Sequence, residues 1–222
     1  MWPIQLTAGL VGISLLGAQA PLSTFASSKL GMDADSISYI IGAYLVAMII
    51  GALLFPVVSK RFTPRFALIA ASVTVGLGYL AFLVNNATAV GVTLNMVVAG
   101  IGSGALVAAL PAAAAAAAPL GQTGIATGLT NTTKTIGGAF ASAIFAVVLV
   151  LAAGQAVTET ASSLLGYLIV FAICGGAALV AAVSLVFVPR LAFGDVAADE
   201  ATLVAPHEGS VLSPRAPRGA GG

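Results

Sequence analysis

The stretch ISYIIGAYLVAMIIGALLFPVV, residues 37–58, contains no charged side chain and is long enough to cross a membrane as a helix. A bilayer core about 30 Å thick is spanned by roughly 20 helical residues. Outward from this stretch, similar apolar runs recur between short connectors rich in Gly, Pro, Asn and charged residues. The pattern predicts six membrane-spanning helices, at residues 4–26, 37–58, 66–84, 89–110, 124–153 and 164–188.

The composition supports this prediction. The 222 residues include eight Lys and Arg and seven Asp and Glu, so 7% are charged and 59% are hydrophobic, whereas about a quarter of the residues in soluble domains are charged. Small, charged and Pro/Gly residues dominate the end of the chain, a composition that cannot bury enough apolar surface to order itself. We therefore expect a membrane bundle over residues 1–188 and a disordered cytoplasmic tail over residues 189–222.

Several functional classes are excluded by the residue inventory. Cys174 is the single cysteine and His207 the single histidine, so no disulfide, no Cys/His metal site and no Cys-His or Ser-His catalytic pair inside the bundle is expected. The basic residues are nearly balanced by acids, which argues against nucleic-acid binding. The sequence predicts a protein that is not an enzyme, needs no cofactor or metal, and has the lipid bilayer as its main partner.

The basic residues also predict an orientation. Lys60, Arg61, Arg65 and the arginines of the tail fall on one side of the predicted membrane, while Lys29 alone falls on the other. Loops rich in Lys and Arg remain in the cytoplasm. We therefore expect a multi-pass protein of the plasma membrane with both termini in the cytoplasm.

Lys134 is the only ionisable residue inside a predicted span. Helical spacing places Thr127 and Asn131 on the same face, and such a polar stripe is expensive in lipid unless it faces a pathway. These three residues are therefore candidates for a substrate pathway. The alternative, of equal weight, is that Lys134 extends toward the cytoplasmic interface while its neighbours pack helices.

Weaker pathway candidates lie in two other spans. Gln19 and Ser23 share a face of the first span, which Pro21 is expected to kink, and Asn95 lies in the fourth span. For Gln19 the alternative is a hydrogen bond between helices, worth about 1 kcal/mol or less. Small-xxx-small spacing further predicts close helix packing at six glycines: Gly100, Gly104, Gly124, Gly128, Gly137 and Gly138.

Two stretches together resemble the major facilitator superfamily. SKRFTPRFAL, residues 59–68, resembles the basic cytoplasmic loop of that family, although Lys60 occupies the acidic position and Thr63 replaces a glycine. GIGSGALVAALPAAAAAAAPLGQTGIATGLTNTTKTIGGAFASAIF, residues 100–145, is similar to the late helices of the drug:proton antiporter branch with fourteen spans. The resemblance covers residues 1 to about 188.

The resemblance implies an all-α membrane protein whose six transmembrane helices form two three-helix repeats, the C-terminal half of a facilitator fold. It implies efflux of a small, amphipathic molecule of the multidrug type, with Lys60, Arg61 and Arg65 in a cytoplasmic gating loop. The first, second, fourth and fifth spans would face the central cavity. A facilitator binds its substrate between two halves, so a second six-helix half, or a second copy of this chain, would be required. No span contains an acid, so proton coupling would come from elsewhere.

Two alternatives remain open at this point. The chain could be a non-transporting truncated fragment or a membrane assembly subunit whose polar stripe only packs helices. It could also be a six-helix permease subunit or a channel, although channels need polar or charged rings around a pore.

Overall fold

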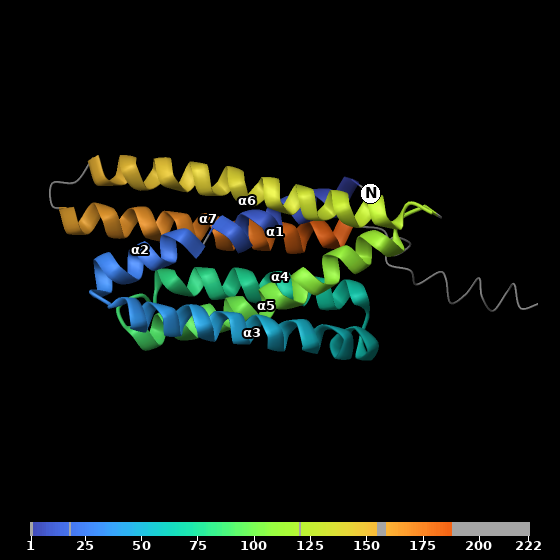
Figure 1. Ribbon diagram of the computed structural model, residues 1–222, viewed down its shortest axis with the longest axis horizontal. Coiled ribbons are helices and arrows are strands. Elements are labelled where there is room, and N and C mark those ends of the chain that lie inside the picture. The colour runs from blue at the N-terminus through green and yellow to red at the C-terminus, as the bar shows by residue number, and fades with distance from the viewer. Residues whose placement is uncertain (1, 18, 120, 155–158, 188–222) are drawn as a thin grey trace, which may run out of the picture.

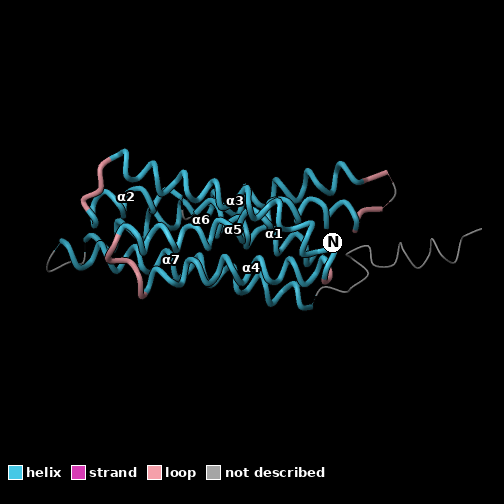
Figure 2. Tube along the Cα trace, turned by 90° about the horizontal axis from the view of Figure 1, so that it is seen from below, coloured by secondary structure: helices cyan, strands magenta, loops and turns pink. Residues whose placement is uncertain are grey.

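The helices form a single elongated bundle. The computed structural model describes residues 2–17, 19–119, 121–154 and 159–187, and within these ranges it contains helices and no strand. The helices run roughly along the long axis, and their connections lie at the two ends of the bundle (Figure 1 and Figure 2). The elements are α1 (Trp2–Gly17), α2 (Gln19–Leu30), α3 (Ala34–Arg61), α4 (Pro64–Leu80), the short 3₁₀ helix η1 (Ala81–Leu83), α5 (Ala89–Ala116), α6 (Thr123–Gly154) and α7 (Glu159–Phe187).

Five of these helices match predicted spans directly. Helices α3, α4 with η1, α5, α6 and α7 are each long and apolar enough to cross a membrane. Helix α5 continues beyond the predicted end of its span, through alanines to Ala116, because alanine has the highest helix propensity. The connection between the first two predicted spans is shorter than predicted, because α2 and α3 are separated only by residues 31–33.

The first predicted span corresponds to two described segments. Helix α1 is described as far as Gly17 and α2 from Gln19, and residue 18 lies outside the described residues. The kink predicted at Pro21 therefore stays a prediction. Figure 1 shows α1 and α2 following one another along the bundle.

Local signals explain the other helix boundaries. At the end of α2, Gly31 has a φ of +60° and the Met32 amide donates to the Ala26 carbonyl at 3.1 Å, the left-handed termination that favours glycine. At the start of α4, the Thr63 hydroxyl accepts from the Phe66 amide and Pro64 occupies the first turn. Such caps place the turns where the bundle ends.

The packing of the helices repeats itself. Helix α3 packs along α5 and α1 packs along α6, while α4 contacts both α5 and α7, and α1 contacts α7. If α1 is exchanged with α5, α3 with α6 and α4 with α7, the α3–α5 contact maps onto α1–α6, the α4–α5 contact maps onto α1–α7, and the α4–α7 contact maps onto itself. The bundle therefore consists of two three-helix repeats, the arrangement found within each half of facilitator-type transporters.

An aromatic cluster joins both repeats at one end of the bundle. The rings of Phe82 and Phe171 stack with centroids 4.2 Å apart, and Phe25 packs edge-on against Tyr167 at 5.4 Å and against Phe171 at 6.1 Å. Aromatic pairs of this kind contribute about 0.5–1.5 kcal/mol beyond burial. The cluster fixes α2 against α7.

Candidate functional site

Three polar contacts attach α1 to its neighbours. The Gln5 amide donates to the Thr130 hydroxyl of α6 at 3.1 Å, and the Thr7 and Ser184 hydroxyls lie 2.9 Å apart. The Ser14 hydroxyl donates to the Cys174 carbonyl of α7 at 2.8 Å. Hydrogen bonds between helices replace solvation that lipid cannot supply. These contacts hold α1 between α6 and α7.

Close backbone contact fixes the position of Lys134. A Cβ on Gly12 of α1 would collide with the Lys134 carbonyl, and a Cβ on Gly137 would collide with the Gly9 carbonyl. Small residues let two helices approach in this way. The backbone of α6 at Lys134 is therefore held directly against α1.

The polar stripe of α6, formed by Thr127, Asn131 and Lys134, is only partly covered by other helices. Asn131 is exposed, Thr127 and Lys134 are half-buried, and the Lys134 ammonium donates to Asn131 Oδ1 at 3.2 Å. The Thr127 hydroxyl instead donates to the backbone, to the carbonyls of Thr123 and Gly124, each at 3.0 Å. The structure thus brings Lys134 and Asn131 together, while Thr127 bonds within its own helix.

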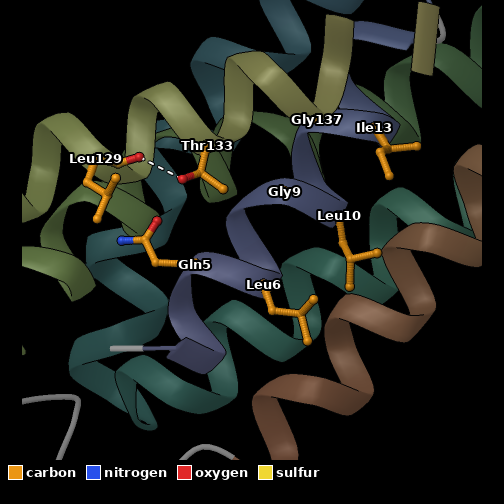
Figure 3. A pocket seen from close by; sticks show the side chains of 8 residues that line it. All are labelled: Gln5, Leu6, Gly9, Leu10, Ile13, Leu129, Thr133 and Gly137. Atoms are coloured by element: carbon orange, nitrogen blue, oxygen red, sulfur yellow. Dashed lines mark hydrogen bonds between the residues drawn. The ribbon is translucent and has the colours of Figure 1, made fainter. Parts of the chain in front are cut away.

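A groove of about 680 Å³ lies on the other flank of α6. It is lined by Gln5, Leu6, Gly9, Leu10 and Ile13 of α1 and by Leu129, Thr133 and Gly137 of α6. Figure 3 shows these side chains around the crossing of the two helices. The lining is almost entirely apolar, although Gln5 Oε1 is buried without a hydrogen-bond partner. The sequence prediction did not single out Gln5. The feature that could have identified it is a polar amide side chain about one turn into an apolar segment.

The weaker candidates occupy different environments. Asn95 is 5% exposed, and its amide donates at 2.8 Å to the carbonyl of Asn85 in the connection before α5, which attaches that connection to the helix. Ser23 is half-buried in α2. Gln19 begins α2, and its side chain lies outside the described residues. Their role in a pathway stays a prediction.

The six glycines also differ among themselves. A Cβ on Gly100 would lie 2.7 Å from the Tyr44 carbonyl oxygen, and one on Gly104 would collide with the Met48 carbonyl, so both lie against α3. Gly138 is buried. No atom of the described chain lies within 4 Å of a Cβ on Gly124 or Gly128. Packing at these two positions stays a prediction and would need a surface beyond this bundle.

The basic turn is tied to the end of α7. Arg65 Nε donates to the Leu185 carbonyl at 3.2 Å, and its Nη2 contacts the Val186 carbonyl. Cations are favourable at helix C-termini, where carbonyls lack helical partners. Lys60 and Arg61 are exposed at the end of α3. Of the three basic residues, Arg65 therefore connects the two repeats.

No group of three metal-binding side chains comes together among the residues that the structure describes. Cys174 is buried in the core with its thiol near the Ile13 carbonyl, at 3.9 Å. A buried thiol of this kind behaves as a small apolar residue.

A family model described as the Major Facilitator Superfamily matches residues 6–216. The chain belongs to the major facilitator superfamily. Membership identifies a multi-pass membrane protein of a transporter family rather than an enzyme. No curated protein sequence matches the chain.

Solved structures of this superfamily share the fold. The chain is similar to the inward-open xylose transporter XylE from E. coli, with a TM-score of 0.69 and 20% identity over 91% of this chain and 53% of that one. It is also similar to the partially occluded inward-open form, with a TM-score of 0.65 and 19% identity over 85% of this chain and 47% of that one. The chain therefore spans about half the length of these transporters and has the fold of one superfamily half.

Proposed function

We propose that this chain is one six-helix half of a facilitator-type exporter for small, amphipathic molecules, and that it works with a second six-helix half or with its own copy. The observation that carries the proposal is the two-repeat packing of a chain that spans about half the length of the solved transporters. A facilitator binds its substrate where two such halves meet.

The uneven coverage of the helices supports a second half. Buried residues make up 22% of the most apolar part of α3 and 17% of that of α6, against 44% to 56% in α4, α5 and α7. Helices α3 and α6 correspond to each other in the two repeats, and the resemblance assigns both to the central cavity. The polar stripe with Asn131 and Lys134 belongs to this less covered α6.

Photo-crosslinking in membranes tests the pairing. We expect p-benzoylphenylalanine in place of Ser142, exposed on α6, to yield a cross-linked polypeptide, either the chain's own dimer or a partner. The matched control is the same group in place of Val183 of α7, which is 56% exposed, and here we expect adducts with lipid only. Equal polypeptide cross-linking at both positions, or none at Ser142, would contradict the proposed interface.

Flux through liposomes that contain the full chain tests the transport itself. We expect saturable uptake of at least one of three amphipathic probes: tetraphenylphosphonium, chloramphenicol or benzoate. Flux that rises linearly with concentration would indicate a channel. A chain that forms its dimer in the liposomes yet moves none of the probes would favour a non-transporting assembly subunit.

Labelling of single cysteines tests the orientation. The basic turn, the N-terminal end of α1 and the C-terminal end of α7 lie at the same end of the bundle (Figure 1), and we propose that this end is cytoplasmic at the plasma membrane. In a Cys174→Ala background, a membrane-impermeant maleimide should reach Ala87→Cys from outside intact cells, and should reach Lys60→Cys only after the cells are opened. The reverse result would invert the topology.

A further inference from the structure

Lys134 carries the only positive charge placed well inside a described apolar helix. It lies eleven residues after Thr123, the first residue of α6, which corresponds to about 16 Å along the helix. None of the described carboxylates pairs with it, and its ammonium donates to Asn131 Oδ1. A lysine at the centre of a spanning helix costs about 2.5–3.5 kcal/mol unless water or an anion compensates it.

The hydrogen-bonding groups around this lysine leave donors free. Lysine has three N–H donors and no acceptor, so the Asn131 oxygen must face it and the Asn131 NH₂ group points elsewhere as a donor. The hydroxyls of Thr127 and Thr135 donate to backbone carbonyls of their own helix, the latter to Asn131 at 2.9 Å. The stripe therefore offers N–H donors from Lys134 and Asn131. These donors match a ligand group that only accepts hydrogen bonds, such as a carboxylate.

Small residues leave room beside these donors. Gly128 lies three residues before Asn131, and no described atom lies within 4 Å of the Cβ that it lacks. Gly124, one turn earlier, is equally open. Since residues three and four apart are neighbours on a helix surface, the open space adjoins the donor pair. The apolar groove with Gln5 lies on the other flank of α6 and is a separate feature.

We propose that Lys134 Nζ and Asn131 Nδ2 bind the carboxylate of the transported molecule, so that the substrates of this protein are amphipathic organic anions. The inference rests on the proposed transport function. It names the chemistry of the substrate: one oxygen of the carboxylate accepts from the ammonium and the other accepts from the amide, while the apolar part of the molecule lies beside the glycines.

Benzoate and benzamide test the site, because they have the same shape and differ in charge. For the purified full chain in dodecyl maltoside, we expect saturation-transfer NMR to give a Kd for benzoate at least tenfold below that for benzamide. Lys134→Met and Asn131→Asp should both abolish this preference. The first removes the ammonium, and the second places a carboxylate that pairs with the ammonium in place of the ligand. Lys134→Arg should retain it. The matched control Lys60→Met removes an exposed lysine at the end of α3 and should change nothing.

Two results of the binding measurement would overturn the inference: equal affinity of the two ligands for the folded wild-type chain, or a preference for benzoate that survives in Lys134→Met. Circular dichroism checks the fold of each variant, and Asn131→Asp with Lys134→Arg keeps the test decisive if Lys134→Met does not fold. In native membranes, a carbodiimide cross-link between Lys134 and a polypeptide carboxylate would assign the anion to a partner and overturn the substrate assignment.

Binding and flux separate the two proposals. Saturable flux without a benzoate preference would overturn the anion site and leave transport intact. A benzoate preference without flux of any probe would preserve the site and contradict the transport function.

Discussion

Replacement of Arg65 by methionine tests the contact that joins the two repeats at the end with the basic turn. Arg65 donates to the carbonyls of Leu185 and Val186 in the last turn of α7. The helical donor for the Leu185 carbonyl would be residue 189, which is a proline without an N–H. Arg65 therefore supplies the donor that the proline at this position lacks.

The expected loss follows from these two contacts. Hydrogen bonds that involve a charged group contribute about 1.5–3 kcal/mol each, but the site lies at the half-exposed end of the bundle. A cation at a helix C-terminus contributes about 0.3–1 kcal/mol, and up to about 2 when partly buried. We expect Arg65→Met to lower the free energy of unfolding by about 1–2 kcal/mol, a factor of roughly 5–30 in the unfolding equilibrium.

Unfolding of the full chain in dodecyl maltoside by added dodecyl sulfate, followed by helical ellipticity, measures this loss. The matched control is Arg61→Met, because Arg61 is exposed at the end of α3; its loss should stay below about 0.5 kcal/mol. The loss of unfolding free energy in Arg65→Lys should lie between those of the other two variants, since lysine keeps the positive charge but lacks the planar set of N–H donors of the guanidinium. The reasoning is refuted if Arg65→Met and Arg61→Met destabilise the chain equally.

Two substitutions with matched controls, and one labelling experiment, test the helix contacts. Gly12→Ala should destabilise the bundle by about 1–3 kcal/mol, because the added Cβ meets the Lys134 carbonyl. The control Gly128→Ala adds its Cβ in open space and should stabilise the isolated chain by up to about 1 kcal/mol. Effects of the same sign in the same assay would be inconsistent with the close crossing of α1 and α6. Ser14→Ala removes the 2.8 Å bond to the Cys174 carbonyl and should cost about 0.5–1 kcal/mol, while Ser38→Ala, on an exposed face of α3, should cost nothing measurable. Cys174 is fully buried, so maleimide should label it only after unfolding; rapid labelling of the folded chain would contradict its burial.

The membrane helices were predictable because one property decides them. Apolar runs of spanning length are separated by connectors with charged residues, Gly, Pro or Asn, and that pattern located α3, α4, α5, α6 and α7 without any knowledge of packing.

The candidate site was predictable in part. Helical spacing placed Asn131 and Lys134 on one face, and they form a hydrogen bond. The spacing rule could not distinguish Gly100, which lies against α3, from Gly128, which faces open space, because both have glycine partners four residues away. The bond between Gln5 and Thr130 joins residues far apart in the sequence, and only the assembled bundle reveals it.

The Arg65 contact has an evolutionary consequence. Its acceptors are main-chain oxygens, which every amino acid provides, so Leu185 and Val186 can be exchanged for other helix-forming residues without loss of the bond. Arg65 would then be under selection by itself, with no compensating change elsewhere in related sequences. Methods that infer proximity from correlated substitutions would consequently overlook this contact between the two repeats.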